Sequence, residues 1–357
     1  MLSEEQEELR KVVRSFLSAT ASPSQVRRLM DTADGFDGAV WGRMASELGL
    51  TALAVPESAG GMGFGWIELG VVFEEMGRAL AGGPLLASAA TAAGALMAAG
   101  AGAEDLLPGV ARGETIATLA VAEDRGRWDE AGVTLTATEQ GRLHGHKSWV
   151  VDGLSADLIL VAARGGLYAV EGGAPGLTRT PIPTLDLTRK LARLEFDATP
   201  ARRLADGHAA VRAGLACGAI ALANEQVGGA QRCLEMAVAH AKTRKQFGRT
   251  IGSFQAVKHK CADMLREIES ARSTAAYANW AADQPDRGEL LVAASLAKVA
   301  CSEAYLHATE ECIQIHGALG FTWEHDAHLY FKRAKSSLLL FGDPTYHRGL
   351  LANLQGL

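Results

Sequence analysis

RKQFGRTIGSFQAVKHKCADM, residues 244–264, is the stretch that best indicates how this chain folds. Its first half is cationic and interrupted by glycines, which predicts a connection between two helices. Its second half opens a run in which apolar residues recur at helical spacing, namely Val257, Cys261, Met264, Leu265, Ile268, Ala271 and Ala275. Such a stripe is typical of a helix that buries one face, so we expect a helix over 255–284.

The remainder of the C-terminal part repeats this pattern. The segments 208–242, 288–315 and 325–354 are also predicted to be helical, which makes four long helices. Four helices of this length are what a bundle needs to enclose a core. Residues 205–357 are therefore predicted to form a C-terminal four-helix bundle.

The sequence pattern before the bundle is no longer helical. Residues 113–204 hold short runs rich in β-branched side chains, such as ADLILVAAR and RKLARLEFD, separated by Gly, Asp or Pro. Such runs predict a small antiparallel β-domain, without the strand–helix alternation of a Rossmann sheet. Residues 1–112 read as helical, and Ser3 with Gln6 forms a capping-box pair. The predicted class is α+β: an N-terminal helical domain, a middle β-domain and the bundle.

Composition indicates an ordinary soluble protein. The 357 residues are 48% hydrophobic and 21% charged, with a net charge of −6, which gives no reason to expect nucleic acid or anionic lipid as a partner. No apolar run reaches the ~18 residues of a membrane span. The N-terminus MLSEEQEELRK lacks a signal-peptide core, and the five cysteines are scattered. A cytoplasmic protein with reduced thiols is expected.

Four motifs resemble the acyl-CoA dehydrogenase family. They are the stretch 244–264, IQIHGALGFTWEHDAHLYFKRAK (313–335), VPESAGGMGFG (55–65) and GHKSWVVDG (145–153). The resemblance implies FAD, an acyl-CoA thioester substrate, a dimer or dimer of dimers, and an electron-transfer flavoprotein or similar acceptor. In that chemistry a carboxylate removes the proton α to the thioester carbonyl while the flavin accepts a hydride.

The resemblance also implies which residues hold FAD. Arg244 matches the arginine that holds the pyrophosphate, with Phe247 and Gln255 near the cofactor and Gln314 and Gly317 at its adenosine diphosphate end. A guanidinium fork suits two phosphate oxygens. Ala318 replaces the second glycine that usually follows Gly317. In the family these residues reach across the dimer into the neighbour's FAD site.

The residues that a family member uses for its own flavin are mostly missing. VAEDRGRWD (121–129) places Ala122 where a threonine is usual and Asp124 where a proline is usual. Trp149 remains and is expected to flank the flavin, but Val150 and Val151 stand where a hydroxyl is usual.

Both family positions for the base lack a carboxylate. Phe341 occupies one and Gly218 the other. Glu225 lies seven residues after Gly218, on nearly the same helix face but two turns away, ~11 Å. We interpret Glu225 as a structural residue paired with an arginine or a backbone group, and keep it as the first substitute base. Asp343 ranks below it, because it can equally be the N-cap before Pro344.

Two other patterns contain residue types found in ligand sites. EHDAH (324–328) is interpreted as a solvent-facing turn and helix start, and no metal site is expected. GGMGFG (60–65) has the glycine spacing of a dinucleotide loop but is predicted to be a bend between helices.

The pattern as a whole favours a heteromer. The chain would contribute its intact FAD-binding residues to a paralogous subunit that supplies the flavin face and the base. The expected assembly is an α2β2 tetramer with one FAD per heterodimer. The resemblance extends to heteromeric enzymes of sterol side-chain breakdown, so a bulky acyl group such as a steroid side chain is the expected substrate. The alternatives are a homo-oligomeric flavoenzyme with Glu225 or Asp343 as base or with oxygen-using chemistry, and a non-catalytic scaffold.

Overall fold

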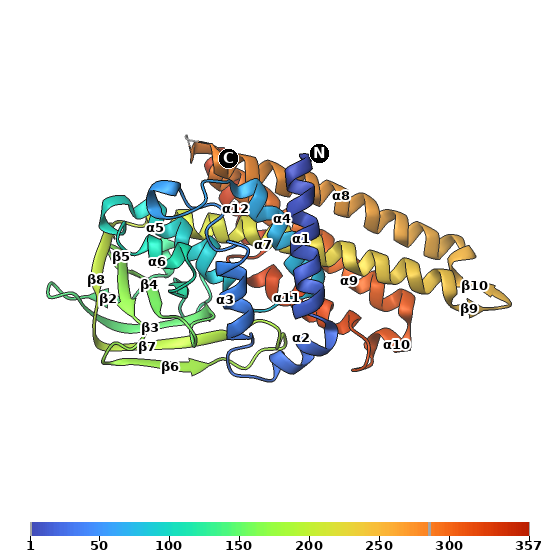
Figure 1. Ribbon diagram of the computed structural model, residues 1–357, viewed down its shortest axis with the longest axis horizontal. Coiled ribbons are helices and arrows are strands. Elements are labelled where there is room, and N and C mark those ends of the chain that lie inside the picture. Colours follow the sequence, from blue (N-terminus) through green and yellow to red (C-terminus); the bar gives the residue numbers. More distant parts are fainter. Residues whose placement is uncertain (1, 285–286, 357) are drawn as a thin grey trace. The chain divides into compact units, whose positions relative to one another are not determined.

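The computed structural model describes residues 2–284 and 287–356. It divides into two compact units. The bundle unit comprises Met1–Val26, Gly70–Ala81 and Leu222–Leu357, and the β unit comprises Arg27–Leu69 and Gly82–Ala221. Figure 1 colours the chain along its sequence and labels the elements of both units.

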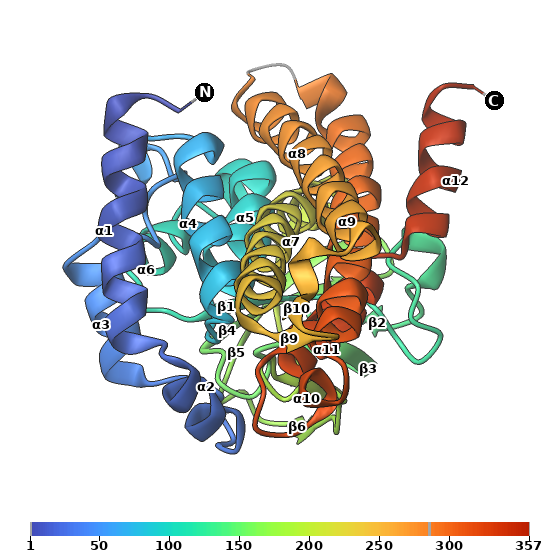
Figure 2. The same cartoon turned by 90° about the vertical axis from the view of Figure 1, so that its right-hand side faces the viewer.

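The bundle unit is helical apart from one short hairpin. Its elements are α1 (Glu4–Thr20), the greater part of α4 (Trp66–Ala79), the second half of α7 (Ala209–Thr243), β9 (Lys245–Gln246), β10 (Arg249–Thr250), η5 (Ile251–Ser253), α8 (Gln255–Asp283), η6 (Arg287–Glu289), α9 (Leu290–His316), α10 (Ala318–Phe321), α11 (Ala327–Leu339) and α12 (Pro344–Leu354). Figure 2 looks nearly along α7, α8, α9 and α11 and shows them grouped as a bundle.

The first three predicted bundle helices are confirmed to within two residues at each end. α8 buries Met264, Ile268, Ala271 and Ala275 of the predicted stripe, whereas Leu265 is exposed. α9 is buried on most sides, as expected for a helix at the centre of a bundle. By length and hydropathy α9 also meets the criteria for a membrane span, but 56% of its most apolar window is buried, as in the core helix of a soluble protein.

The fourth predicted helix is wrong as a single element. It is two helices, α11 and α12, separated by a corner at residues 340–343. Phe341 and Gly342 have φ values of +62° and +105°, which no α-helix accommodates. Pro344 then begins α12 with Asp343 as its N-cap, since proline is tolerated at the first helical position.

Charged side chains hold α1 onto α4. Arg14 Nη2 lies 2.7 Å from Glu75 Oε1, and the Glu75 side chain is 2% exposed. Arg10 Nη2 lies 3.1 Å from Glu74 Oε2. The predicted capping box of Ser3 and Gln6 is confirmed at the start of α1.

The β unit combines short helices with two four-stranded sheets. The helices are α2 (Pro23–Met30), α3 (Gly38–Ser46), η1 (Glu57–Ala59), the start of α4, η2 (Leu86–Ala92, a π-helix), α5 (Ala93–Ala99), η3 (Gly100–Gly102), α6 (Leu107–Ala111), η4 (Glu130–Gly132) and the first half of α7. GGMGFG is confirmed as a bend between helices rather than a loop after a strand.

One sheet has the order β1–β4–β5–β8 and the other β2–β3–β7–β6. The strands are β1 (Ala117–Ala120), β2 (Thr136–Ala137), β3 (Arg142–Val151), β4 (Leu158–Ala163), β5 (Gly166–Glu171), β6 (Leu177–Pro181), β7 (Leu191–Pro200) and β8 (Arg202–Asp206). The middle β-domain is confirmed, but its pairing is not purely antiparallel, because β1 runs parallel to β4. Between β1 and β4 the chain forms β2 and β3 of the second sheet. Both β1 and β4 are buried throughout, as parallel strands usually are.

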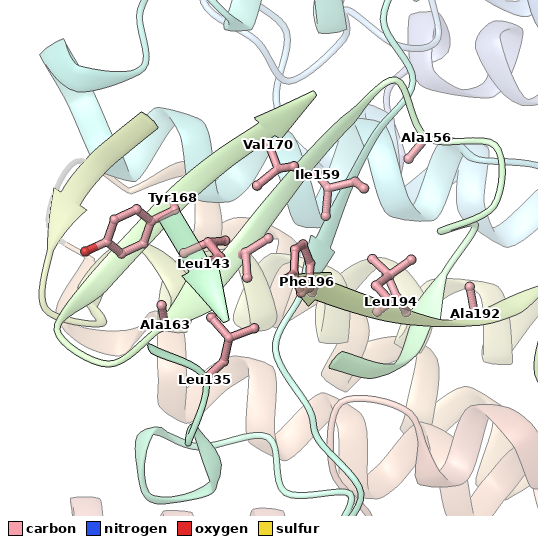
Figure 3. Close-up of a cluster of buried hydrophobic side chains, with 13 residues drawn as sticks. Leu135, Leu143, Ala156, Ile159, Ala163, Tyr168, Val170, Ala192, Leu194 and Phe196 are labelled. Carbon is pink, nitrogen blue, oxygen red and sulfur yellow. The ribbon is translucent and has the colours of Figure 1, made fainter. Parts of the chain in front are cut away.

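The two sheets enclose a common apolar core (Figure 3). Leu143 and Phe196 come from one sheet and Ile159 and Val170 from the other, and each of these four side chains is at most 3% exposed. Burial of such side chains stabilises the fold by ~1.5–3 kcal/mol each. The core therefore fixes the strands that carry the residues around Trp149.

Candidate functional site

The predicted FAD-binding residues of the bundle unit stand exposed on its surface. Arg244 follows directly after α7, and its carbonyl accepts a hydrogen bond from Ile251 N at 2.8 Å, which closes the β9–β10 hairpin. Phe247 lies in the hairpin turn with φ +50° and is 91% exposed. Gln255 is the exposed first residue of α8. These side chains are thus presented outward from a backbone that is itself hydrogen-bonded.

The second group lies at the end of α9. Gln314 is exposed in the last turn, and Gly317 ends the helix with φ +63°. Apart from its chain neighbours, no atom of the described residues lies within 4 Å of the point where a side chain at Gly317 would begin. A ligand can therefore approach the backbone here, as in other nucleotide sites where glycine exposes the main chain.

Contacts between α7 and α9 bring these two groups to one end of the bundle. The rings of His240 and His316 are 4.4 Å apart between centroids. His240 lies four residues before Arg244, and His316 lies directly before Gly317. One guanidinium, two amide side chains and an open glycine backbone therefore form a donor set that suits a pyrophosphate and its nucleotide.

The same end carries large apolar side chains that the sequence analysis did not single out. Phe321 is 82% exposed, Trp323 54% and Leu319 48%, in and just after α10. Exposed apolar groups that gather in this way mark interaction surfaces. The signal in the sequence was GFTW (320–323), because its two aromatic residues lie outside the predicted helices.

In the β unit, Trp149 is the residue that is predicted to flank the flavin. Trp149 interrupts β3 at a bulge with φ +61° and is 37% exposed. Ala122, Val150 and Val151 are at most 5% exposed and supply no hydroxyl group. The positions where family members usually carry hydroxyls are therefore buried and apolar in this chain.

A charged cluster, which the sequence analysis also missed, lies beside Trp149. Asp124 accepts hydrogen bonds from Arg193 at 2.5 Å and from Ser148 at 3.2 Å, and His146 Nε2 lies 3.0 Å from its other oxygen. The hydrogen bond from Arg193 lowers the pKa of Asp124. Asp124, where a proline is usual, thus serves to tie β3 to β7.

The corner between α11 and α12 contains Phe341, at the position where the resemblance predicts a base. Phe341 is 4% exposed, and its carbonyl accepts a hydrogen bond from His347 Nε2 at 3.1 Å. Because a carbonyl oxygen can only accept, Nε2 carries a proton, and Nδ1 lies 3.0 Å from Ser295 Oγ. Burial, and after it the charge of Lys298, lowers the pKa of His347 to about 4.

Lys298 fixes the same corner from α9. Its side chain is fully buried, and Nζ donates to the carbonyls of Ser337 and Leu338 at 2.9 Å each. A cation at the last carbonyls of α11 is favourably placed against the helix dipole. The corner is therefore firmly held, and it contains the buried aromatic ring of Phe341, which cannot accept a proton.

Glu225 is held in a buried ion pair. Arg333 Nη1 lies 2.8 Å from Glu225 Oε1, and the two side chains are 2% and 3% exposed. The interpretation of Glu225 as a structural residue paired with an arginine is thereby supported by its geometry. Asp343 accepts a hydrogen bond from Tyr346 N at 2.7 Å as N-cap of α12. Gly218 and the neighbouring Ala219 are buried in α7 and provide no ionisable group.

EHDAH is less solvent-facing than expected. His328 is 6% exposed and its Nε2 lies 3.2 Å from Trp323 O, and His325 Nδ1 accepts from Ala327 N at 3.1 Å. The histidines therefore cap a turn and the start of α11. Over residues 2–284 and 287–356, no group of three His, Cys, Asp or Glu side chains is arranged to hold a metal ion.

Comparison with known proteins decides the family. The model of the acyl-CoA dehydrogenase N-terminal domain matches residues 3–114, and that of the C-terminal domain matches residues 205–354. Acyl-CoA dehydrogenase IpdE2 of Mycobacterium tuberculosis is 36% identical over 345 residues, which cover 96% of this chain and 94% of that protein. This chain belongs to the acyl-CoA dehydrogenase family.

Solved structures agree with this assignment. The Tcur3481-Tcur3483 steroid ACAD is similar with a TM-score of 0.89 and 32% identity, over 99% of this chain and 98% of that one. The ChsE4-ChsE5 complex from Mycobacterium tuberculosis contains a similar chain, with a TM-score of 0.90 and 28% identity. The similarity covers 100% of this chain and 98% of that one. This acyl-CoA dehydrogenase family member is thus an FAD-dependent oxidoreductase by family, and its α+β fold is the expected one.

Proposed function

We propose that this chain is the base-lacking subunit of a heteromeric acyl-CoA dehydrogenase that desaturates the α,β-bond of an acyl-CoA thioester. The observation that carries the proposal is the contrast between two sets of residues. Arg244, Gln314 and Gly317 match the family motifs and are exposed, whereas Phe341, at the position where the resemblance predicts the base, is a buried aromatic ring. A subunit with this contrast can help to hold a cofactor but cannot remove a proton.

The residues at the exposed end of the bundle would hold the FAD of a partner subunit. Arg244 would pair with the pyrophosphate, Gln314 and the open backbone at Gly317 would contact the adenosine diphosphate part, and Phe247 and Gln255 would lie nearby. FAD, when bound, supplies the hydride acceptor of the reaction. The exposed Phe321 and Trp323 would be covered by the partner.

The base and the complete flavin face would come from the partner, a paralogous chain of the same family. In this chain Ala122 and Val151 offer no hydroxyl to a flavin, and Asp124 is bonded to Arg193. Trp149 is the one side chain of this region that we propose would flank a flavin. We infer an α2β2 assembly in the cytoplasm, with an electron-transfer flavoprotein or a similar protein as acceptor.

The substrate we propose is a bulky acyl-CoA, such as one with a steroid side chain. Support comes from the similarity to the Tcur3481-Tcur3483 steroid ACAD. The homo-oligomeric alternative would need Glu225 or Asp343 as base. It is disfavoured because Glu225 is ion-paired to Arg333 at 2.8 Å and Asp343 caps α12.

Co-expression tests the proposal. The chain expressed alone should be colourless or insoluble, and the chain co-expressed with a paralogous subunit should purify as a yellow complex that oxidises an acyl-CoA. A chain that is yellow and active by itself would support the homo-oligomer instead. A chain that stays colourless with every paralogue would support a scaffold.

A further inference from the structure

Three histidine rings are stacked at the end of the bundle that carries Arg244. They come from α7 (His240), the last residue of α9 (His316) and the segment before α11 (His325). The His316 ring lies 4.4 Å, between centroids, from the His240 ring and 4.4 Å from the His325 ring. His316 is 8% exposed, and the two outer rings are half-buried. We call these three rings the histidine column.

The histidine column adjoins both groups of predicted FAD-binding residues. Arg244 N donates to the His240 carbonyl at 2.8 Å, so Arg244 lies one helical turn beyond His240, at the spacing that brings side chains to one face. His316 directly precedes Gly317, and its Cβ lies 2.9 Å from the point where a side chain at Gly320 would begin. The backbone that follows Gly317 therefore turns closely over the central ring of the column.

Hydrogen bonds fix the protonation of two nitrogen atoms in the column. His316 Nδ1 lies 2.7 Å from the Cys312 carbonyl oxygen, which can only accept, so this Nδ1 carries a proton. His325 Nδ1 lies 3.1 Å from Ala327 N, which can only donate, so this Nδ1 carries none. The start of α11 therefore holds His325 in its neutral form, and an added proton on the column resides on His240 or His316.

The charge of Arg244 opposes the addition of a proton to the column. Burial, and after it the charges of His316 and Arg244, lowers the pKa of His240. Burial also lowers the pKa of His316, but the contacts of His316 with Cys312 outweigh this effect and raise the pKa overall. Two imidazoles in ring contact titrate as one unit, because a charge on one disfavours a charge on the other. Uptake of a proton by this unit therefore depends on whether the Arg244 charge is neutralised.

Other charged or titratable groups belong to the elements that carry or contact the column. Those that follow His240 along α7 and the hairpin are all cationic, namely Lys242, Arg244, Lys245 and Arg249. On α9 they are Cys312 and Glu311, which is bonded to Lys260 of α8, and Glu324 and Asp326 flank His325. The cationic groups on the α7 side favour the approach of an anion to this end of the bundle.

We propose that His240 and His316 are further residues of the diphosphate site around Arg244, and that the diphosphate of FAD binds there together with one proton. When Arg244 is neutralised by the diphosphate, its repulsion of a protonated ring is removed. The diphosphate and the proton then favour each other's binding by the same free energy, as two linked ligands must. This inference rests on the proposed FAD site and adds a dependence on pH, which Arg244 alone cannot supply because arginine stays charged.

The affinity of the complex for FAD should fall as the pH rises. The two rings bind more protons with FAD in place than without it, so the gain in affinity is present at low pH and is lost through the range in which imidazoles titrate, about pH 5–8. One linked proton changes the dissociation constant by up to about tenfold per pH unit. FAD itself takes up no proton in this range, because its diphosphate is esterified at both ends.

The experiment measures the dissociation constant of FAD from the complex of this chain with its paralogous partner, between about pH 5.5 and 8.5. Fluorescence of the released flavin is the readout, at constant ionic strength. His240→Gln and His316→Asn should each flatten the pH dependence, and each replacement keeps an amide that can hydrogen-bond in place of a ring nitrogen. His259→Gln, which changes an exposed histidine of α8, should leave the pH dependence as it is. Because His316 is buried, His240→Gln alone decides the matter if His316→Asn does not assemble.

Arg244→Ala separates this inference from the proposed function, since it should weaken FAD binding at every pH. If it does so while His240→Gln retains the full pH dependence, the proposed FAD site stands and the linked proton is overturned. A dissociation constant that does not vary with pH in the unaltered complex would overturn it as well. Equal affinity of the Arg244→Ala complex and the unaltered complex would overturn both the FAD site and the inference.

Discussion

Arg333 Nη1 lies 2.8 Å from Glu225 Oε1, and both side chains are almost completely buried in the bundle. Glu225 is the carboxylate that the sequence analysis ranks first as a substitute for the base expected at Phe341 or Gly218. Breaking a buried ion pair leaves an uncompensated charge and is strongly destabilising. The role of Glu225 can therefore be tested through stability and turnover together.

Replacement of Glu225 by Gln should lower the stability of the chain and leave the turnover of the complex nearly unchanged. The loss in free energy of unfolding should be on the order of 3 kcal/mol, since the Arg333 charge remains buried. Thermal unfolding and acyl-CoA oxidation measure the two effects. Glu114→Gln, which breaks the exposed pair of Arg112 and Glu114, should change neither. Loss of turnover with flavin retained would make Glu225 the base.

Stability should depend on pH through His347. Its pKa in the folded chain is about 4, below its ordinary value of 6.5, so the unfolded chain binds more protons between these values. The free energy of unfolding should therefore fall as the pH drops from about 6.5 to about 4, by an amount on the order of 2–3 kcal/mol. Urea unfolding at several pH values measures it. His347→Gln should flatten this slope and the exposed His259→Gln should not; equal slopes would contradict the assignment.

Two glycines near the corner should respond oppositely to the same change. Gly342 has φ +105°, and a side chain there would come within 2.3 Å of the Tyr346 ring, so Gly342→Ala should destabilise the chain by more than about 1 kcal/mol. At Gly349, in α12, no atom of the described part of the chain other than the adjacent helix backbone lies within 4 Å of that point. Gly349→Ala should stabilise by about 0.5–1 kcal/mol. Chemical unfolding of both variants checks the geometry of the corner. That geometry would be wrong if Gly342→Ala raised the free energy of unfolding and Gly349→Ala lowered it.

Arg244 should be required for flavin retention in the complex. Arg244→Ala removes the cation proposed to hold the pyrophosphate, so the complex should assemble but lose FAD on gel filtration. Arg266→Ala is the matched control, because Arg266 is also an exposed arginine but its guanidinium pairs with Glu267 on the surface of α8. Absorbance of flavin relative to protein is the readout. Equal retention by both variants would remove Arg244 from the cofactor site.

Much of the fold could be predicted from the sequence because its signals are local. The apolar stripe after Gln255 and the glycine-rich break before it place α7 and α8 within one or two residues of their observed ends. The split of the last helix was equally local, since Gly342 and Pro344 are strong helix breakers, but helical periodicity on both sides outweighed them in the prediction. The strands β5, β6 and β8 were not predicted, because the glycines and prolines that border them favoured loops.

Interactions between distant residues could not be predicted in this way. Lys298 is hydrogen-bonded to the carbonyl of Ser337, 39 residues away, and Asp124 to Arg193, 69 residues away. Neither pair has a sequence signature, because the partners meet only after the helices and strands have packed. The parallel pairing of β1 with β4 was hidden for the same reason. The predicted FAD-binding residues could be named only because their motifs resemble those of a known family.

The ratio of flavin to polypeptide in the purified native assembly tests the central claim most directly. We predict one FAD for each pair of unlike chains, and little or no flavin on this chain when it is purified by itself. One FAD on every copy of this chain in the absence of a partner, together with rapid acyl-CoA desaturation, would contradict the account.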